Sequence, residues 1–350
     1  MSEASHDETR IEDWVASESK KRAEGKMKKW ILWGGIALGA LAVIGGIIFF
    51  LTRGKKAPKT EEIPYLEGLD VECGPNGITA LPGGGFLVTD IYGKKIWELL
   101  GKNAKVFAGA ETARDASGRP MGGYQDANYE ECLFAEPWAI TPFLGGYAVS
   151  DTKNHVVRLL KDGVVETLNG FSDQLASDDM GVTFEAPTGL ATDDQGRLYV
   201  ADTEQGIIYV ITEQGEVDVF YEGLNNPMGI CWSDGALYVA ETGEHQILRI
   251  ADGVKIVFAG NGEEGEEDGL TTTATFSCPQ GVAAGKDGTI YVSDTVNGAV
   301  RRIAGGKVET IWKLKDDALD TFPVSPVGMC CENDVLYVCD PFSRRIYVLK

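Results

Sequence analysis

The segment from Pro279 to Ile311 reads PQGVAAGKDGTIYVSDTVNGAVRRIAGGKVETI and has the pattern of four short antiparallel strands. Its apolar residues alternate or cluster over runs of about 4 to 8, and Gly or Asp-Gly marks each reversal of the chain. This pattern predicts hairpins and not helices. One small sheet cannot bury both of its faces, so the segment requires copies of itself.

Six copies occur in the chain. Each begins with Pro-x-Gly-apolar and ends its second strand in an acid, although Ala139 replaces the Gly of the second copy. The acid lies 14 or 15 residues after the Pro in every copy, whereas successive acids are 39 to 61 residues apart. A constant hairpin with variable connections, repeated at about 50 residues, predicts an all-β, six-bladed β-propeller. The motif acids are Asp90, Asp151, Asp202, Glu241, Asp294 and Asp340.

The repeats resemble a known family. DTKNHVVRL, from Asp151 to Leu159, combines a strand-ending Asp with Asn-His and an apolar run, and together with the Pro-x-Gly starts it is similar to the NHL repeat. The resemblance covers all six units, roughly residues 70 to 350, and implies a six-bladed propeller. Glu241 replaces the Asp of the fourth unit, and Asn-His is intact only in the second, so no family function transfers residue by residue.

A membrane anchor is predicted ahead of the propeller. Residues 1–29 form a polar tail, and the 22 residues from Trp30 to Leu51 carry no charge. As a helix they would span roughly 33 Å, enough to cross a bilayer core. A cleaved signal peptide would have a shorter apolar region. Six Lys or Arg precede the span and four follow it within 15 residues, which favours a cytoplasmic tail and an extracytoplasmic propeller.

Two further expectations concern assembly. Gly35, Gly39, Ala42 and Gly46 fall on one side of the predicted transmembrane helix, where small residues permit a homodimer. After a linker at residues 52–64 the propeller begins, and it extends over residues 65–350. The last unit lacks a fourth strand, so Tyr65 to Glu72 is predicted to supply it and close the ring.

The candidate ligand-binding residues lie at the channel mouth and on the loop face. The residue after each motif Pro is expected to face the channel mouth, and the mixed character of these residues suits a small-ligand or peptide pocket. Tyr124 lies on the long linker after the first unit. Phenylalanines at 134, 184, 276 and 322 precede the next Pro and are expected to plug the junctions between blades. The predicted ligand-binding residues are Asn76, Tyr124, Trp138, Thr188, Met228 and Gln280.

No catalytic residue or metal site is predicted. His155 and His245 are the two histidines of the propeller, too few for the zinc-binding trio of amidating-lyase relatives. Calcium is the one cofactor left open, because gluconolactonase-like propellers hold it in the channel through carboxylate and amide oxygens. The recurring motif acids are expected to accept backbone N–H groups of the following corner.

The charge of the chain excludes nucleic acid as a partner. From Thr60 onward the chain has 46 acidic and 21 basic residues, and its net charge of −25 would repel phosphates. The seven cysteines lack metal-ligand spacing and are interpreted as free buried thiols. The sequence therefore favours a membrane-anchored binding or scaffold module for a protein, peptide or glycan. The alternative left open is a metal-dependent lactonase-like or lyase-like propeller enzyme.

Overall fold

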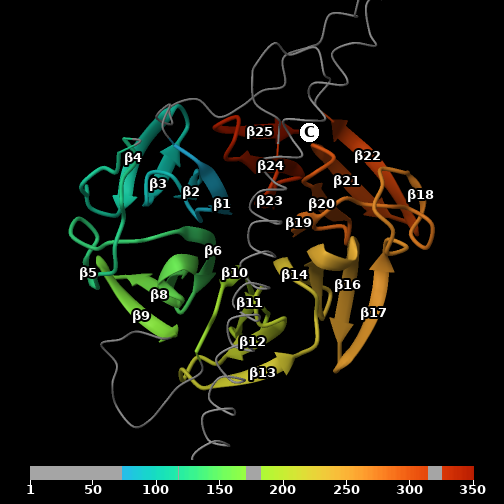
Figure 1. The fold of residues 1–350 in the computed structure, drawn as a ribbon, viewed down its shortest axis with the longest axis horizontal. Helices are drawn as coiled ribbons and strands as arrows, with labels where there is room; N and C mark the ends of the chain where they lie inside the picture. The colour runs from blue at the N-terminus through green and yellow to red at the C-terminus, as the bar shows by residue number, and fades with distance from the viewer. Residues whose placement is uncertain (1–72, 117, 171–182, 314–324) are drawn as a thin grey trace, which may run out of the picture. The chain divides into compact units, whose positions relative to one another are not determined.

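The computed structural model of the protein describes residues 73–116, 118–170, 183–313 and 325–350. These residues form six antiparallel sheets, and Figure 1 shows them arranged in a ring as the blades of a propeller. Blades are numbered here in chain order. The all-β, six-bladed fold predicted from the repeats is confirmed.

Blades 1 to 3 each contain four strands in sequence order from the channel outward, and blade 2 adds a short fifth strand, β5, at its outer edge. The strands of blade 1 are β1 (Pro75–Ala80), β2 (Phe86–Asp90), β3 (Lys95–Leu100) and β4 (Asn103–Ala108). Those of blade 2 are β5 (Ala127–Asn128), β6 (Pro137–Phe143), β7 (Gly146–Asp151), β8 (Val156–Lys161) and β9 (Val164–Gly170). Those of blade 3 are β10 (Pro187–Thr192), β11 (Leu198–Asp202), β12 (Ile207–Ile211) and β13 (Val217–Tyr221).

Blades 4 to 6 follow the same order, and β18 adds an outer strand to blade 5 as β5 does to blade 2. The strands of blade 4 are β14 (Pro227–Ser233), β15 (Ala236–Glu241), β16 (Gln246–Ala251) and β17 (Val254–Ala259). Those of blade 5 are β18 (Gly269–Leu270), β19 (Pro279–Ala284), β20 (Ile290–Asp294), β21 (Ala299–Ala304) and β22 (Lys307–Lys313). Those of blade 6 are β23 (Met329–Glu332), β24 (Val335–Asp340) and β25 (Arg345–Leu349).

The constant spacing of the motif reflects one fixed hairpin register. In blades 1 to 5 the motif Pro pairs directly with the motif acid, as Pro75 does with Asp90 and Pro279 with Asp294. A register irregularity follows each of these prolines. A slip of one residue would turn the buried side chains to the other face of the sheet, so the register is strongly specified.

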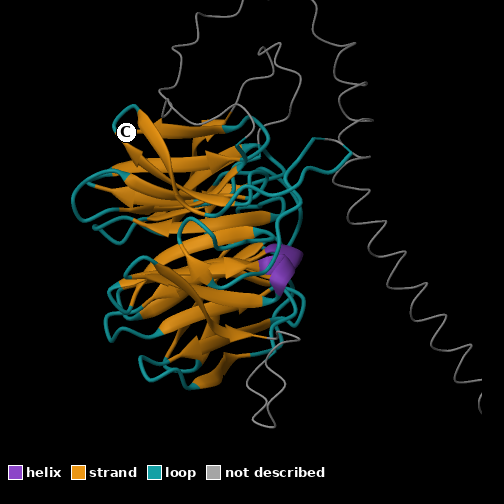
Figure 2. Ribbon diagram, turned by 90° about the vertical axis from the view of Figure 1, so that its left-hand side faces the viewer, coloured by secondary structure: helices purple, strands orange, loops and turns teal. Residues whose placement is uncertain are grey.

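All corners between the second and third strands lie on one face of the ring, which we call the corner face. The linkers between blades leave from this face, because each fourth strand ends beside the start of the third. Two corners contain short 3₁₀ helices, η1 (Thr152–Asn154) and η2 (Thr242–Glu244), which lie on the same side of the ring in Figure 2. The corner residues are 91–94, 152–155, 203–206, 242–245, 295–298 and 341–344.

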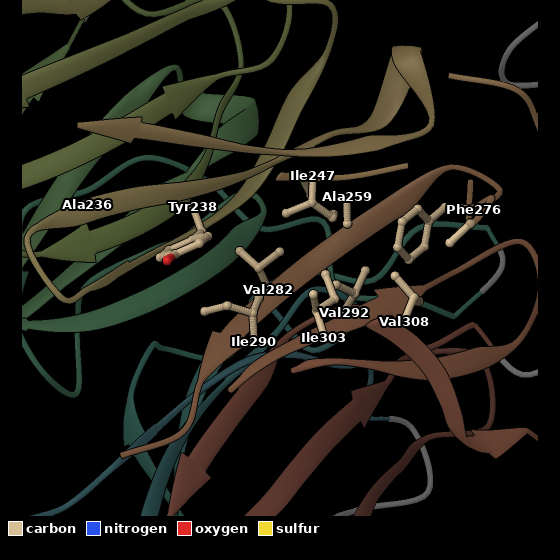
Figure 3. Close-up of a cluster of buried hydrophobic side chains, with 12 residues drawn as sticks. Ala236, Tyr238, Ile247, Ala259, Phe276, Val282, Ile290, Val292, Ile303 and Val308 are labelled. Carbon is tan, nitrogen blue, oxygen red and sulfur yellow. The ribbon is translucent and has the colours of Figure 1, made fainter. Parts of the chain in front are cut away.

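Each of the six junctions between neighbouring blades buries a hydrophobic cluster of its own. Figure 3 shows the cluster between blades 4 and 5, where Phe276 packs near Val308 and Ala259. Phe134 and Phe184 are buried in the same way between blades 1 and 2 and between blades 2 and 3. The predicted role of these three phenylalanines as plugs is confirmed, and residue 322 lies outside the described residues.

The ring is closed by packing between blade 6 and blade 1. Ile346 and Cys339 of blade 6 share a cluster with Val88 and Leu99 of blade 1, and β1 lies beside β23. Within the described residues blade 6 has three strands, with β25 at its outer edge. The predicted closing strand at residues 65–72 lies outside the described residues.

The structure describes no helix that is long and apolar enough to cross a bilayer. The predicted transmembrane segment from Trp30 to Leu51 lies outside the described residues, as do Gly35, Gly39, Ala42 and Gly46. Residues 62–350 form one compact unit that contains the whole propeller.

Candidate functional site

The channel is narrow because the inner strands approach one another at glycines. Five blades carry Gly two residues after the motif Pro, and a Cβ atom there would lie 1.8 to 2.6 Å from a carbonyl oxygen of the next blade. In blade 2 Ala139 takes this place, and its N–H donates to Ser150 Oγ. The Ser150 hydroxyl in turn donates to the Thr188 carbonyl of blade 3. These contacts hold the inner strands of neighbouring blades close together around the channel.

A cavity of about 80 Å³ lies at the corner-face end of this channel. It is lined by the second to fourth residues of the repeated Pro-x-Gly-apolar motif, which start the inner strands at the corner face. Its polar and aromatic side chains are those of Asn76, Trp138 and Gln280, and none of the lining residues is charged. The structure thus brings together three of the six predicted ligand-binding residues.

Asn76 is held rigidly at the wall of the cavity and is only 1% exposed. Its Nδ2 donates to the Trp138 carbonyl of blade 2 at 3.0 Å, which fixes the orientation of the amide because an oxygen could not face that carbonyl. Asn76 Oδ1 has no hydrogen-bond partner among the described residues. A buried acceptor without a partner is costly, so the side chain has a vacant hydrogen-bonding site.

The other three predicted residues lie elsewhere. Thr188 is buried, and its hydroxyl is within hydrogen-bond distance of Thr203 Oγ1. Met228 is half-buried, and neither it nor Thr188 lines the cavity. The Tyr124 hydroxyl bonds with Thr167 Oγ1 at 2.7 Å, and its ring lies against the Arg158 guanidinium. Tyr124 thus supports the fold of the linker on which it lies.

The predicted hydrogen bonds from the following corner are found for three motif acids, because Asp90, Asp202 and Asp340 accept backbone N–H groups there. The other three acids, Asp151, Glu241 and Asp294, accept backbone N–H groups of the preceding linker instead. Asp90 Oδ1 accepts the N–H groups of Tyr92 and Gly93 in the corner, and also that of Gly74 before the motif. Asp340 is less well paired, since its Oδ2 has no hydrogen-bond partner among the described residues. Burial raises the pKa of the Asp340 carboxyl, and the N–H group of Ser343 only partly offsets this.

A fully buried arginine anchors the linker before blade 5. Arg301 Nη1 donates to the Asp294 carboxylate at 2.6 Å and to the Thr275 carbonyl at 3.0 Å. Its Nη2 donates to Asp268 and to the Glu267 carbonyl of the linker. The arginine therefore ties the motif acid to the linker through four hydrogen bonds.

Arg158 repeats this arrangement in blade 2. It donates to the motif acid Asp151 and to Asp126, which lies next to β5. Blades 2 and 5 stand on opposite sides of the ring, so the two anchored linkers, with β5 and β18, flank the channel from two sides (Figure 1). Neither arginine was predicted from the sequence as an anchor. Their signal is an Asn three residues and an Arg seven residues after the acid, which only these two units share.

The donor set of the cavity does not match a metal site. Calcium takes six to eight oxygen ligands and usually includes carboxylates, whereas the side chains that line the cavity include two amides and no carboxylate, and the others are apolar or aromatic. The described part of the chain holds no group of three or more His, Cys, Asp or Glu side chains placed to bind a metal ion. His155 Nδ1 lies 2.5 Å from the Glu185 carbonyl, and His245 Nδ1 accepts the Cys278 N–H. Both histidines connect one blade to the next linker.

One of the six repeats matches the model of a known protein family. The family model of the NHL repeat matches residues 276–303, which include β19 and β20. The match lies within the fifth of the six repeated units. A relative from Arabidopsis thaliana, Protein SUPPRESSOR OF QUENCHING 1, chloroplastic, is 27% identical over 249 residues, which are 64% of this chain and 20% of the plant protein. NHL repeat-containing protein 2 of Homo sapiens is 38% identical over 78 residues, 21% of this chain and 11% of the human protein.

The chain therefore spans a fifth or less of the length of these two relatives. Among solved structures, an auxiliary nutrient binding protein from Bacteroides thetaiotaomicron superposes with a TM-score of 0.61 at 13% identity, over 82% of this chain and 75% of that one. Virginiamycin B lyase from Staphylococcus aureus, solved with quinupristin, superposes with a TM-score of 0.53 at 17% identity, over 82% and 98% of the two chains. At these identities the similarity shows the fold alone.

Proposed function

We propose that this NHL propeller is a membrane-anchored binding module that engages a protein, peptide or glycan partner on its corner face. The cavity at the channel mouth carries the proposal. It combines the buried amide of Asn76 with the partly exposed side chains of Trp138 and Gln280. A concave site with an aromatic side chain and a few fixed polar groups is the usual form of a ligand site.

The anchored linkers extend this site. Each is fixed to the ring by a buried arginine, Arg158 or Arg301, so each presents its outer residues from a rigid base. Binding residues are often found on such loops above a rigid scaffold, because loops can vary without disturbing the core. The linker before blade 2 also exposes Met121, which is 64% exposed. A partner larger than the cavity would contact both linkers and insert one group into the channel mouth.

The partner is expected to be neutral or basic. The region from Thr60 onward carries a net charge of −25, and the linker before blade 5 has five acidic residues between Gly262 and Gly269. A surface field of this sign repels anions and speeds the approach of cations. The proposed partner is therefore a protein, a peptide or a glycan without acidic groups.

The proposal places the propeller outside the cytoplasm, anchored by the apolar segment from Trp30 to Leu51. The support is the charge bias of the flanking residues, since cytoplasmic flanks are richer in Lys and Arg. Protease treatment of intact cells carrying a tag after Lys350 tests this placement. Loss of the tag from sealed cells is expected. Protection of the tag until lysis would place the propeller in the cytoplasm and overturn this part of the proposal.

The binding role is tested by exposing the full-length protein in detergent micelles to arrays of peptides and of glycans. We expect a reproducible set of ligands that is lost in Trp138→Ala. Trp232→Ala is the matched control, since Trp232 is also partly exposed but lies in blade 4 at the end of β14, away from the corner face. Tyr124 is a poor choice for substitution because it supports Arg158.

The thermal melting of each variant is measured alongside binding. Ligands that bind Trp138→Ala and the wild type equally, with both proteins folded, would contradict the assignment of the site to the channel mouth. If the folded wild-type protein bound neither peptides nor glycans on the arrays, the proposed binding role would be contradicted.

A further inference from the structure

The strand β17 is an outer edge of the ring with an apolar surface. Blade 4 has the strand order β14-β15-β16-β17, and no strand in the described part of the chain pairs with the far side of β17. Figure 1 shows β17 at the outer rim of the propeller. Its side chains of Val254, Ile256 and Val257 are 62%, 47% and 52% exposed. An open edge of this kind can pair with a strand of another chain.

Blades 2 and 5 show how this fold covers such an edge. Val165 of β9 pairs with Ala127 of the linker strand β5, and Val308 of β22 pairs with Gly269 of β18. Lys255 holds the same place in β17, since each is the second residue of an outer strand that follows a two-residue turn. Because hydrogen-bonded and non-hydrogen-bonded pairs alternate, the N–H and C=O groups of Lys255 point away from β16. Blade 4 is therefore built to receive a further strand at this register.

The linker before blade 4 is too short to supply that strand. Only residues 222–226 lie between β13 and β14. Leu224 is buried between blades 3 and 4, and its N–H donates to the Gly206 carbonyl. The Asn225 carbonyl accepts the N–H of Gly243 in the corner of blade 4. These contacts hold the linker at the corner face, away from the outer rim.

Lys255 does not protect the edge. Lysine on an edge strand commonly prevents pairing with other chains, because its charge resists burial. Lys255 Nζ lies 5.7 Å from the centroid of the Tyr221 ring in blade 3. The side chain is therefore directed toward the neighbouring blade, and the backbone of β17 stays accessible.

The side chains beside this edge indicate what kind of strand fits. In blades 2 and 5 the residue before the linker strand is an aspartate, Asp126 or Asp268, which binds an arginine and a threonine paired across the two outer strands. In blade 4 the corresponding pair is Leu248 and Val257. These two side chains offer a carboxylate no cation and no hydroxyl, so burying one there is costly. An apolar side chain suits this place instead.

We propose that β17 binds an extended strand of a partner protein. The strand pairs antiparallel with Lys255 and carries an apolar residue where Asp126 and Asp268 precede β5 and β18. A second copy of this chain fits less well, because the region from Thr60 onward has a net charge of −25 and two copies repel each other. This site lies on the outer rim, apart from the channel mouth, and does not depend on the proposed function.

The test is fluorescence anisotropy of labelled peptides with the full-length protein in detergent micelles. The probe is a peptide with the sequence of residues 123–129, GYQDANY, carrying the change Asp126→Val. It is expected to bind, and the unchanged sequence to bind about tenfold more weakly, because its carboxylate finds no donor side chain. N-methylation at Ala127 removes the N–H that pairs with Lys255 and is expected to abolish binding.

Two variants of the protein locate the site. Val257→Glu is expected to abolish binding of the probe, because it places a carboxylate beside the apolar residue of the peptide. Val219→Glu is the matched control, since Val219 is also 52% exposed but lies on β13, the outer strand of blade 3. Binding to this control is expected to be unchanged. Both positions are exposed, and melting curves check that both variants are folded.

Several results would overturn the proposal. Absence of probe binding to the folded wild type would show that this edge takes no strand. Equal binding of the N-methylated probe, or undiminished binding of the probe to Val257→Glu, would show that the contact is not strand pairing with β17. Equal binding of the probe and the unchanged sequence would contradict the choice of an apolar residue. Self-association of the wild type that Val257→Glu abolishes, measured by sedimentation, would make a second copy the occupant.

Discussion

The carbonyl oxygen of Val327 lies 1.8 Å from the point where a Cβ atom on Gly281 would be placed. The two residues belong to neighbouring blades, so the inner strands of blades 5 and 6 touch backbone to backbone. No rotamer change can relieve a clash with a main-chain oxygen. The glycine of the motif is therefore required by the closeness of the blades.

Gly281→Ala is expected to destabilise the propeller by about 1–3 kcal/mol or more, because the blades must move apart. Gly83→Ala is the control, since a Cβ atom there meets no atom within 4 Å. Thermal melting followed by circular dichroism compares the two variants. A melting temperature for Gly281→Ala equal to that of the control would show that the ring adapts without cost.

Arg301→Met is expected to cost about 3–5 kcal/mol, because it leaves the buried carboxylate of Asp294 without its cation. Arg302→Met is the matched control one residue away. Arg302 is about half-exposed and pairs with Glu309 at the surface, and such pairs contribute about 0–1 kcal/mol. Chemical denaturation measures both free energies of unfolding, and similar values for the two variants would contradict the anchoring role of Arg301.

Asp340 should make stability depend on pH. Burial raises the pKa of its carboxyl above the ordinary value of 3.8, so the folded state holds the proton more tightly than the unfolded state. The stability that this carboxyl contributes is therefore lost as the pH rises from 3.8 through the raised pKa. Asp340→Asn, which stays neutral, should gain stability relative to the wild type as the pH rises above 3.8.

The control for this experiment is Asp334→Asn, which changes an exposed carboxylate in the turn between β23 and β24. Melting temperatures of the wild type and both variants are compared across this pH range. If the difference between Asp340→Asn and the wild type did not change with pH, the buried carboxyl would not be the source of the dependence.

The cysteines should react unequally with alkylating agents. All seven are free thiols, and Cys132 and Cys339 are fully buried. Burial raises the pKa of Cys132 to about 11 and raises that of Cys339 as well, so both stay protonated at about pH 8 and react slowly. Mass spectrometry after iodoacetamide treatment should find the partly exposed cysteines modified before these two, namely Cys231, Cys278, Cys330 and Cys331.

Removal of residues 1–72 should lower the melting temperature more than removal of residues 1–64. The reason is the predicted closing strand from Tyr65 to Glu72, which would pair with β25 at the outer edge of blade 6. Both shortened chains lack the apolar segment, so they differ only in this strand. Equal melting temperatures would contradict the prediction that Tyr65 to Glu72 supplies the closing strand of blade 6.

The propeller could be predicted from the sequence because one hairpin register repeats. The pairing of Pro279 with Asp294 fixes the spacing of motif Pro and acid, and that spacing is visible without a structure. The channel-mouth site could be predicted only in part. Of the residues that follow the motif proline, Asn76, Trp138 and Gln280 line the cavity, whereas Thr188 at the same position forms hydrogen bonds within the ring.

The linkers were the least predictable part. β5 and β18 contain two residues each, too few to give a recognisable pattern. Tyr124 was predicted to bind a ligand because it is an aromatic residue on a long loop, but its ring lies on Arg158. That contact joins residues far apart in the chain, and a buried arginine under a loop leaves no local signature beyond its spacing from the motif acid.

The two buried arginines attach each long linker to the ring at a few defined residues. Asp268 and Glu267 are bound by Arg301 of the blade that follows them, and Asp126 is bound by Arg158 in the same way. Each linker thus supplies an aspartate and a backbone carbonyl, and in both blades these bind the guanidinium group of a buried arginine. Because the two attachments are alike, we expect that loops with new recognition surfaces can be grafted between these attachment points without redesigning a blade.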